Sequence, residues 1–356
     1  MSASPLVSII INNYNYGRFL GNAIESALNQ TYAQVEVIVV DDGSTDESAG
    51  VIARYGGRII AFRQQNAGQA AAVNAGYARA RGDVVIFLDA DDMLLPHIAK
   101  RVASVFRDSP DVTRVQYRLA VVGPDGVRTG RSIPADDALM PSGDRRRELA
   151  RFNNYAWWPP MTGNAFSANT LRRIMPMPEE PYRLAADYYL IRAATLCGPI
   201  YSLDEVGAHY RMHGGNAYLS NTFDLERTRE QILLINESHA VLRRFASSIE
   251  FADFPSRASD ALDLRFFALR MASLRLDPVA HPFPEDRLLP LAARGAVVAF
   301  GQTQRSIVFR CAAAAWFAAM VFSPRGLGWS LAKWFFFPES RPVTARPKAS
   351  APQVAA

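Results

Sequence analysis

Cysteine and lysine are scarce in this sequence, and both shortages narrow the class of protein. Two cysteines, Cys197 and Cys311, occur in 356 residues, which excludes a disulfide framework and suits a reducing cytoplasm. The positive charge comes mostly from arginine, because Lys100, Lys333 and Lys348 are the only lysines. The planar guanidinium suits phosphate, so the net charge of +5 fits a pyrophosphate ligand or an anionic membrane face. The basic residues are scattered, and no nucleic-acid partner is expected.

Long apolar runs and targeting signals are also missing. Residues 1–5 show no basic region followed by an apolar one, so we expect no cleaved signal peptide. In the C-terminal third, the longest stretch without a charged residue is 311–324. That is shorter than the ~20 apolar residues of a membrane-spanning helix. We therefore predict a cytoplasmic protein without a transmembrane helix.

Two nucleotide-binding patterns are absent after the first predicted strand. The Gly-x-Gly-x-x-Gly pattern of dinucleotide-dependent oxidoreductases does not occur there. A phosphate loop rich in Gly and Lys or Arg, typical of sugar nucleotidyltransferases, is missing as well, since residues 12–18 read Asn-Asn-Tyr-Asn-Tyr-Gly-Arg. We therefore rank a sugar nucleotidyltransferase second and a non-catalytic nucleotide-sugar-binding or scaffold protein third, below the function that the acidic residues indicate.

The first ninety residues alternate short β-branched runs with helical segments. The runs predict buried strands at Val7–Ile11, Val35–Val40, Ile59–Phe62 and Val84–Leu88. The segments between them predict helices at Arg18–Gln30, Asp46–Arg54 and Gln69–Arg81. This alternation indicates an α/β fold with a Rossmann-like, mostly parallel sheet flanked by helices. Such sheets bind ligands beyond the carboxyl ends of their strands.

The pattern loosens up to about residue 220 and is helical beyond it. We predict a helix near Leu95–Phe106, a strand at Arg114–Val122, a helix around Ala185–Leu196 and a strand at Ile200–Tyr210. Further helices are predicted at Phe223–Phe245, Ser306–Phe322 and Leu327–Phe337. The sequence thus divides into an α/β domain at 1–220, a helical extension at 221–340 and a disordered tail at 341–356.

Acidic residues cluster where such a sheet binds ligands. They are Asp41 and Asp42 after the second strand, Asp89, Asp91 and Asp92 after the fourth, and Asp187 at the start of a later helix. Carboxylates held close together repel one another unless a cation or hydrogen-bond donors compensate. A diphosphate leaving group needs a hard divalent cation held by one or two carboxylates. An acceptor hydroxyl needs a carboxylate base. Sugar transfer from a nucleotide diphosphate accounts for all three groups of acids.

Some of these residues also have purely structural interpretations. Ser44 with Glu47 matches a capping box, which would start a helix. Asp91 or Asp92 could be a loop acid near the start of the next helix. Tyr14 could be a core or a surface aromatic side chain without a ligand role. Two acidic clusters at strand ends of one sheet favour the functional interpretation.

A series of short motifs runs in order along residues 5–218. It comprises Val7–Asn15, Gln30–Tyr32, Val39–Asp46, Asn66–Gly68 with Asn74 and Gly76, Gly82–Asp83, Phe87–Asp92, Asp187–Leu190 and Tyr210–Asn216. In this order and at this spacing, the motifs resemble those of family 2 glycosyltransferases. The resemblance implies a GT-A fold, a nucleotide-sugar donor and inversion of the anomeric centre.

The resemblance also implies roles for individual residues. Tyr14 would lie against the nucleobase, whose edge Asp42 would hydrogen-bond. Asp91 would be a metal ligand, usually for Mg²⁺ or Mn²⁺, and His213 would be a further metal ligand or a diphosphate contact. Asp187 would be the general base. The implied donor-binding residues are Asn13, Tyr14, Asp41, Asp42, Asn74, Asp89, Asp92 and Arg211.

One departure and two open alternatives accompany these roles. The family often carries two adjacent acids before the base helix, but here Ala186 precedes Asp187. His213 lies in a Gly-rich segment where a histidine is often merely solvated. Trp157 and Trp158 either line an acceptor pocket or pack beneath a loop. No Gln-x-x-Arg-Trp pattern of processive polysaccharide synthases occurs, so we expect single additions.

The C-terminal helices allow two interpretations. They form either a subdomain packed on the catalytic domain or an interfacial pair, at 306–338, that rests on the inner membrane face. Trp316, Trp329, Trp334 and Phe335–Phe337 beside basic residues suit the second. By resemblance, the donor is expected to be a UDP-sugar. The acceptor is expected to be a saccharide or lipid-linked saccharide of bacterial envelope or exopolysaccharide assembly.

Overall fold

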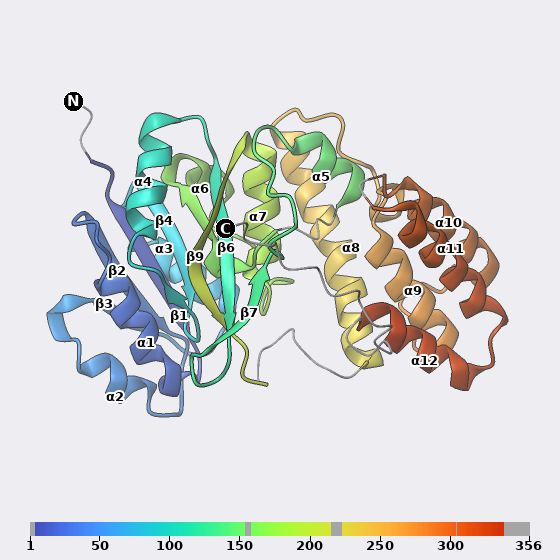
Figure 1. Ribbon diagram of the computed structural model, residues 1–356, viewed down its shortest axis with the longest axis horizontal. Helices are drawn as coiled ribbons and strands as arrows, with labels where there is room; N and C mark the ends of the chain where they lie inside the picture. The colour runs from blue at the N-terminus through green and yellow to red at the C-terminus, as the bar shows by residue number, and fades with distance from the viewer. Residues whose placement is uncertain (1–3, 154–157, 215–222, 304, 338–356) are drawn as a thin grey trace, which may run out of the picture. The chain divides into compact units, whose positions relative to one another are not determined.

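The computed structural model describes residues 4–153, 158–214, 223–303 and 305–337 (Figure 1). Two compact units form within this chain. The first contains Met1–Leu219 and Leu233–Asp263, and the second contains Ser220–Ile232 and Leu264–Ala356. The predicted tail at 341–356 lies outside the described residues, as do Trp157, Gly215 and Asn216. The domain boundaries at residues 220 and 340 stay predictions. The two compact units divide the chain at other positions.

The described part of the first unit contains one nine-stranded sheet, in the order β3-β2-β1-β4-β8-β6-β9-β5 with β7 beside β6. The strands are β1 (Val7–Asn13), β2 (Val35–Asp41), β3 (Ile60–Arg63), β4 (Val84–Asp89), β5 (Met93–Leu94), β6 (Arg114–Val122), β7 (Arg128–Ile133), β8 (Asn164–Ser167) and β9 (Ile200–Arg211). The pairs β1–β2, β1–β4, β2–β3 and β6–β9 are parallel. The short strand β8 joins β4 to β6 by antiparallel pairing on both sides.

Both faces of this sheet are covered by helices (Figure 1). The helices of the first unit are α1 (Gly17–Leu28), α2 (Ser48–Ala53), α3 (Gln69–Tyr77), α4 (Ile98–Asp108), α5 (Arg146–Phe152), α6 (Ala168–Ile174), α7 (Ala186–Cys197) and the second part of α8 (Leu225–Ser248). Short 3₁₀ turns occur at Gly56–Arg58, Met161–Gly163 and Ala258–Asp260.

Side chains of each central strand alternate between the two cores. In β1, Ile9 and Ile11 face the core shared with α1 and α4, whereas Ile10 faces the core shared with α3 and α7. This two-sided burial is why β1, β2 and β4 consist of nearly continuous apolar runs. The predicted α/β fold with a mostly parallel, helix-flanked sheet is confirmed.

Several elements differ from the sequence-based expectation. Strands β5, β7 and β8 and helices α5 and α6 were not predicted. The helix expected near Leu95 begins at Ile98, and α2 begins at Ser48 without a side-chain cap. The predicted capping box is therefore wrong. The Ser44 hydroxyl instead accepts hydrogen bonds from the main-chain N–H of Asn15 (2.9 Å) and the side-chain amide of Asn13 (3.0 Å).

The second unit is helical in its described part, as the sequence predicts. It contains the start of α8, with α9 (Leu264–Leu276), α10 (Leu288–Gly301), α11 (Ile307–Phe322) and α12 (Arg325–Phe336). Gly295 allows α10 to pack closely on α11, because a Cβ there would lie 2.3 Å from the Phe317 ring. In the ranges that the structure describes, no helix combines the length and apolarity needed to cross a bilayer.

Candidate active site

Three parallel strands bring their carboxyl ends to one edge of the sheet. Asn13 of β1 lies opposite Asp41 of β2, and Asn12 lies opposite Asp89 of β4. The Asn13 amide donates to Asp41 Oδ1 at 3.0 Å, and the Asn12 amide donates to Asp89 Oδ1 at 3.3 Å. Strand register alone therefore places the first two acidic clusters side by side, which is where parallel sheets bind ligands.

Asp42 holds the loop that leads into α3. Its carboxylate accepts hydrogen bonds from the N–H groups of Ala67 (2.9 Å) and Gly68 (2.7 Å). The side chains of Gln64 (2.8 Å) and Asn66 (3.2 Å) donate to the same carboxylate. Four donors match the capacity of a carboxylate. Contact between Asp42 and a nucleobase stays a prediction, and it would replace one of the two side-chain donors.

Tyr14 is exposed over 46% of its surface, which rules out its interpretation as a core aromatic. It follows Asn13, whose side chain is buried at the end of β1. The segment after β1 is tied to the segment after β2, because Asp46 accepts from the N–H groups of Gly17 (2.8 Å) and Ser48 (3.0 Å). An exposed aromatic ring on a fixed loop suits stacking against a base.

The Asp89–Asp92 segment presents carboxylates that differ in their partners. Asp92 is buried and accepts from the Thr162 hydroxyl (2.6 Å) and from the N–H of Arg211 (2.9 Å). Asp91 Oδ2 lies 3.0 Å from His213 Nε2. The expected loop acid near the helix start is not a cap, because α4 has no side-chain cap. Asp92 thus supports the turn. Asp91 contacts His213, and Asp89 accepts hydrogen bonds from the side-chain amides of Asn12 and Gln69.

Burial and mutual repulsion raise the pKa values of these acids. Burial raises the pKa of Asp89 to about 7, and the charges of Asp91 and Asp187 add to the effect. Burial is also the main cause that raises the pKa of Asp91, Asp92 and Asp187. Asp187 and Asp89 are about a hundred residues apart in the chain, so their coupling shows that the fold brings the third acid to the first two. Excess negative charge in one place favours a bound cation.

Gln69 connects the acidic strand end to the helix of Asp187. Its amide nitrogen donates to Asp89 Oδ1 at 3.1 Å, and its amide oxygen accepts from the N–H of Ala186 at 3.1 Å. The sequence analysis missed this residue, although it directly follows the Asn66–Gly68 motif. It also missed Thr162, which lies in an irregular segment without periodicity and bonds both Asp92 and the N–H of Asp89 (3.2 Å).

His213 is fixed between two charged partners. Its Nδ1 atom lies 3.2 Å from Nη2 of Arg18, and its ring packs against Tyr16 and Phe19. Because arginine can only donate, Nδ1 accepts, and the proton of a neutral imidazole is on Nε2 and points to Asp91. His213 is therefore no solvated surface histidine. The sequence analysis did not assign Arg18 a role.

The other expected residues have defined positions, and their ligand roles stay predictions. The buried guanidinium of Arg211 donates to main-chain oxygens of Asp91 (2.9 Å) and Pro124 (3.0 Å). Asn74 exchanges two hydrogen bonds of 2.9 Å with the main chain of Met177. Trp158 is partly buried against the core that contains α7, and its role in an acceptor pocket stays a prediction.

The acids and His213 fit a divalent cation that shares its coordination with a diphosphate. Asp91 and His213 offer a carboxylate and an imidazole, a donor set that suits Mn²⁺ and, with phosphate oxygens, Mg²⁺. Within the described ranges, no group of three or more His, Cys, Asp or Glu side chains is arranged to hold a metal alone. A cation bound through phosphates needs only one or two protein ligands, so Asp91 and His213 would be enough to hold it.

Comparisons with known proteins agree with this site. The model of glycosyl transferase family 2 matches residues 8–175. An uncharacterized glycosyltransferase of Nostoc sp. (strain PCC 7120) is 38% identical over 222 residues, which are 60% of this chain and 67% of the relative. This chain belongs to glycosyl transferase family 2. The transferase also matches an uncharacterized glycosyltransferase of Rickettsia typhi, with 39% identity over 111 residues. That match spans 31% of this chain and about a third (35%) of the relative's own length.

The solved structure of Staphylococcus aureus TarS, residues 1–349, shares the fold of the transferase. The TM-score is 0.53 at 16% identity, with 92% of this chain and 89% of that chain covered. The predicted membership of family 2 and the GT-A fold are therefore confirmed. A sugar nucleotidyltransferase, our second hypothesis, is not supported.

Proposed function

We propose that the transferase moves a sugar from a nucleotide diphosphate donor to a hydroxyl of a saccharide or lipid-linked saccharide. The transfer adds one sugar at a time, inverts the anomeric carbon and serves bacterial envelope or exopolysaccharide assembly. The observation that carries this proposal is the convergence of Asp89, Asp91 and Asp187: burial raises the pKa of Asp89 to about 7, and the charges of Asp91 and Asp187 add to the effect. A non-catalytic scaffold has no need for three mutually repelling acids, which cost folding stability.

The donor site begins at the ends of β1 and β2. Tyr14 stacks on the base, Asp42 fixes the loop beneath it, and Asn13 and Asp41 hold the strand ends together. Asp89 and Asp92 belong to the ribose and phosphate side of the site. Asn74 acts through the Met177 segment that it holds. A UDP-sugar is the first donor to test, because TarS has been solved with UDP-GlcNAc.

Asp91 and His213 would hold Mg²⁺ or Mn²⁺ beside the diphosphate. When bound, this cation neutralises the charge that grows on the departing diphosphate. Arg211 fixes the metal-side turn through its bond to the Asp91 carbonyl. Arg18 fixes the ring of His213 and adds a positive charge to the same side of the site.

Asp187 is the base for the acceptor. It takes the hydroxyl proton on a carboxylate oxygen while the acceptor oxygen forms the bond to the anomeric carbon. The bond between that carbon and the diphosphate oxygen breaks at the same time, and its electron pair leaves with the nucleotide diphosphate. Burial raises the pKa of Asp187, which strengthens it as a base compared with a surface aspartate. Gln69 sets the start of its helix relative to Asp89.

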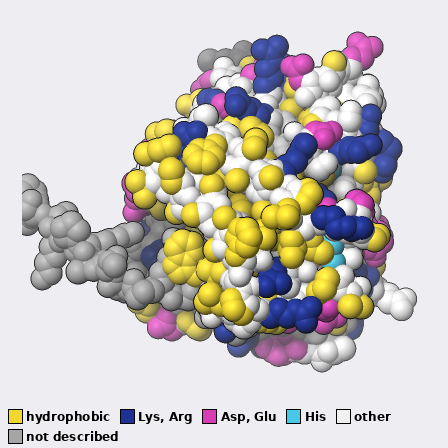
Figure 2. All heavy atoms as spheres, turned by 90° about the vertical axis from the view of Figure 1, so that its right-hand side faces the viewer, with side chains coloured by type: hydrophobic (Ala, Val, Ile, Leu, Met, Phe, Trp, Pro, Cys, Tyr) yellow, Lys and Arg dark blue, Asp and Glu magenta, His cyan; other side chains and the backbone are white. Residues whose placement is uncertain are grey.

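The segment 306–338 provides a peripheral contact with the cytoplasmic face of the membrane. Residues 288–337 contain four arginines, one lysine and no aspartate or glutamate. Figure 2 shows a face on which hydrophobic side chains are interspersed with basic ones. The exposed large side chains of this stretch include Ile307, Val308, Phe322, Leu327, Trp329 and Trp334. Trp316, in contrast, is buried against Phe317 and Phe335 and is no membrane anchor. Basic and aromatic side chains on one face suit an anionic membrane surface.

A thermal-shift panel with UDP, dTDP, GDP, ADP and CDP, each with and without Mn²⁺, tests the donor proposal. We expect UDP with Mn²⁺ to raise the melting temperature most, because a ligand stabilises the state that binds it. A response to a different nucleotide would correct the donor class and keep the site. The absence of any nucleotide response would overturn the proposed transfer function.

A further inference from the structure

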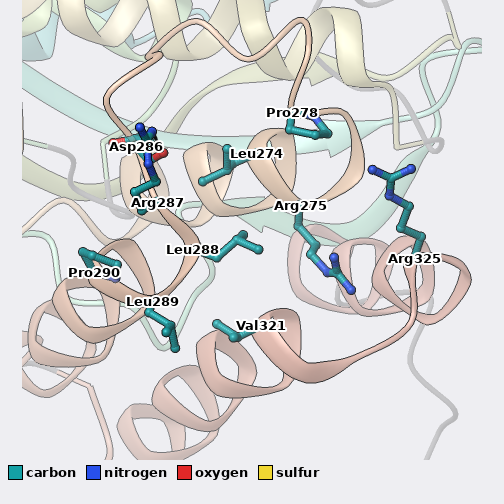
Figure 3. Close-up of a pocket in the computed structure, with 10 residues that line it drawn as sticks. All are labelled: Leu274, Arg275, Pro278, Asp286, Arg287, Leu288, Leu289, Pro290, Val321 and Arg325. Atoms are coloured by element: carbon teal, nitrogen blue, oxygen red, sulfur yellow. Dashed lines mark hydrogen bonds between the residues drawn. The ribbon is translucent and has the colours of Figure 1, made fainter.

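The second unit contains a cavity of about 610 Å³ that is separate in sequence from the donor site. It lies among the end of α9, the segment before α10, the start of α10, the end of α11 and the start of α12 (Figure 3). Its walls are formed by Leu274, Arg275, Pro278, Asp286, Arg287, Leu288, Leu289, Pro290, Val321 and Arg325. This size is typical of pockets for small molecules.

Asp286, the one acid among the residues that line the cavity, already has a positively charged partner. Asp286 accepts two hydrogen bonds from the guanidinium of Arg270, at 2.9 and 2.5 Å. Its Oδ2 atom also lies 2.9 Å from His281 Nε2. Burial alone would raise the pKa of Asp286, but His281 and Arg270 hold it below its ordinary value. Asp286 therefore remains charged, and its charge is balanced by Arg270, which is not among the residues that line the cavity.

Three arginines in the wall have no such counter-charge. Arg287 donates to the carbonyl oxygens of Pro284 (2.7 Å) and Asp286 (2.8 Å), and Arg275 donates to that of Ser323. In the described parts of the chain, none of the three arginines forms an ion pair with a carboxylate. Figure 3 shows Arg287 on one side of the cavity and Arg275 and Arg325 on the other. Three guanidinium groups without a carboxylate partner give this wall an excess of positive charge, and phosphate is an anion that a single guanidinium can bind through two hydrogen bonds.

Two helix starts add to the positive potential at the same cavity. Leu288 and Arg325 are the first residues of α10 and α12. Neither helix has an acidic residue in its first turn or a side-chain cap. The amino ends of helices carry partial positive charge and favour bound anions.

The rest of the wall is apolar. Leu274, Leu288 and Val321 lie between the arginines in Figure 3. Leu289 in the cavity wall is 65% exposed, and Phe322, which follows the lining residue Val321, is 81% exposed. A free inorganic anion would leave these side chains without a partner. An anion attached to an apolar chain would use both parts of the wall.

We propose that this cavity binds the terminal phosphate of a single-chain membrane lipid phosphate, with the first part of its apolar chain along Leu274, Leu288 and Val321. The arginines take the phosphate, and the exposed face beside the cavity takes the bilayer surface. The vesicle arm of the test below rests on the proposed membrane contact, whereas the arm in solution does not. Neither arm measures glycosyl transfer, so failure here leaves the donor-site proposal unaffected.

The first experiment measures binding in solution by calorimetry with geranyl phosphate, a water-soluble phosphate on a short apolar chain. Full-length protein is compared with Arg287→Gln and Arg325→Gln, which remove cavity charges. The control is Arg294→Gln, which removes the same charge from an exposed position of α10 outside the cavity wall. We expect each cavity variant to bind about 10-fold more weakly and the control to bind normally. Inorganic phosphate that binds as tightly as geranyl phosphate would overturn the lipid assignment.

The second experiment measures co-flotation with vesicles. Vesicles of phosphatidylcholine with 5% of a long-chain isoprenyl phosphate are compared with vesicles that carry equal charge as phosphatidylglycerol. We expect stronger flotation with the isoprenyl phosphate, lost in Arg325→Gln and kept in Arg294→Gln. Equal flotation with both vesicle types, or equal losses in the two variants, would show general charge attraction and overturn the cavity site. Circular dichroism of all variants identifies any that fail to fold.

Discussion

The Nε2 atom of His213 lies 3.0 Å from Oδ2 of Asp91, although 122 residues separate the two in the chain. With Nδ1 engaged by Arg18, the shared proton is on Nε2. A cation that takes Nε2 as a ligand requires this proton to move to Nδ1, because a neutral imidazole carries a single N–H, and the contact of Nδ1 with Arg18 would then be lost. This pair therefore provides the most direct test of the metal assignment.

Asp91→Asn should weaken metal-dependent nucleotide binding at least about 10-fold, because the amide has no negative charge to offer the cation. Calorimetry with UDP at saturating Mn²⁺ measures the loss. Asp111→Asn, which changes an exposed acid before β6, is the matched control and should bind normally. Unchanged binding by Asp91→Asn would remove this residue from the metal site.

Asp187→Asn should leave nucleotide binding nearly intact and reduce sugar transfer by about 100-fold or more, the usual contribution of a general base. The substitution keeps the shape of the side chain and removes its ability to take the acceptor proton. Calorimetry measures binding, and release of the nucleotide diphosphate measures turnover. Near-normal turnover would mean that another group is the base.

Burial raises the pKa of Asp187 above its ordinary value of 3.8, so the turnover number should decrease at acidic pH, with a midpoint above 3.8. Below that midpoint the protonated side chain cannot accept a proton, and the rate drops about tenfold per pH unit. The same shift means that the folded state binds the proton more tightly. The contribution of Asp187 to stability is therefore largest below pH 3.8 and is lost as pH rises through the folded pKa. A turnover number that stays constant down to pH 3.8 would contradict this assignment.

Gln69→Ala should lower turnover about 5- to 10-fold, which corresponds to the roughly 1 kcal/mol of one hydrogen bond. Its amide joins Asp89 to the start of the Asp187 helix, so its loss misplaces the base relative to the donor. We expect turnover to change more than the Michaelis constant of the donor. Gln34→Ala, in the loop before β2, is a suitable control. An effect confined to the unfolding free energy would show that Gln69 is structural only.

The sequence predicts the strand ends of the site well, because buried parallel strands are continuous apolar runs that end at Asn13, Asp41 and Asp89. It does not predict β7, whose residues Arg128–Ile133 are mostly exposed and carry no apolar alternation. Thr162 has no local signal, since only the fold brings it to Asp92.

Local rules also failed where a distant contact was stronger. Ser44 satisfies the pattern of a helix cap, but the end of β1 takes its hydroxyl. Residue 42 shows the same effect in a functional motif. The sequence marks Asp42 as a ligand residue, whereas the structure shows a carboxylate that also organises the following loop.

Gly68→Ala should destabilise the protein by about 1–3 kcal/mol and weaken donor binding, because Gly68 has a φ of 95° and donates its N–H to Asp42. An added Cβ would lie 2.4 Å from Cγ and 2.7 Å from the carbonyl oxygen of Arg183. The control is Gly50→Ala, at a helical position of α2 with no atom within 4 Å of the new Cβ. It should stabilise the protein by about 0.5–1 kcal/mol. Urea unfolding measures both. Equal stability of the two variants would show that the loop adapts, and that Asp42 does not depend on the conformation of Gly68.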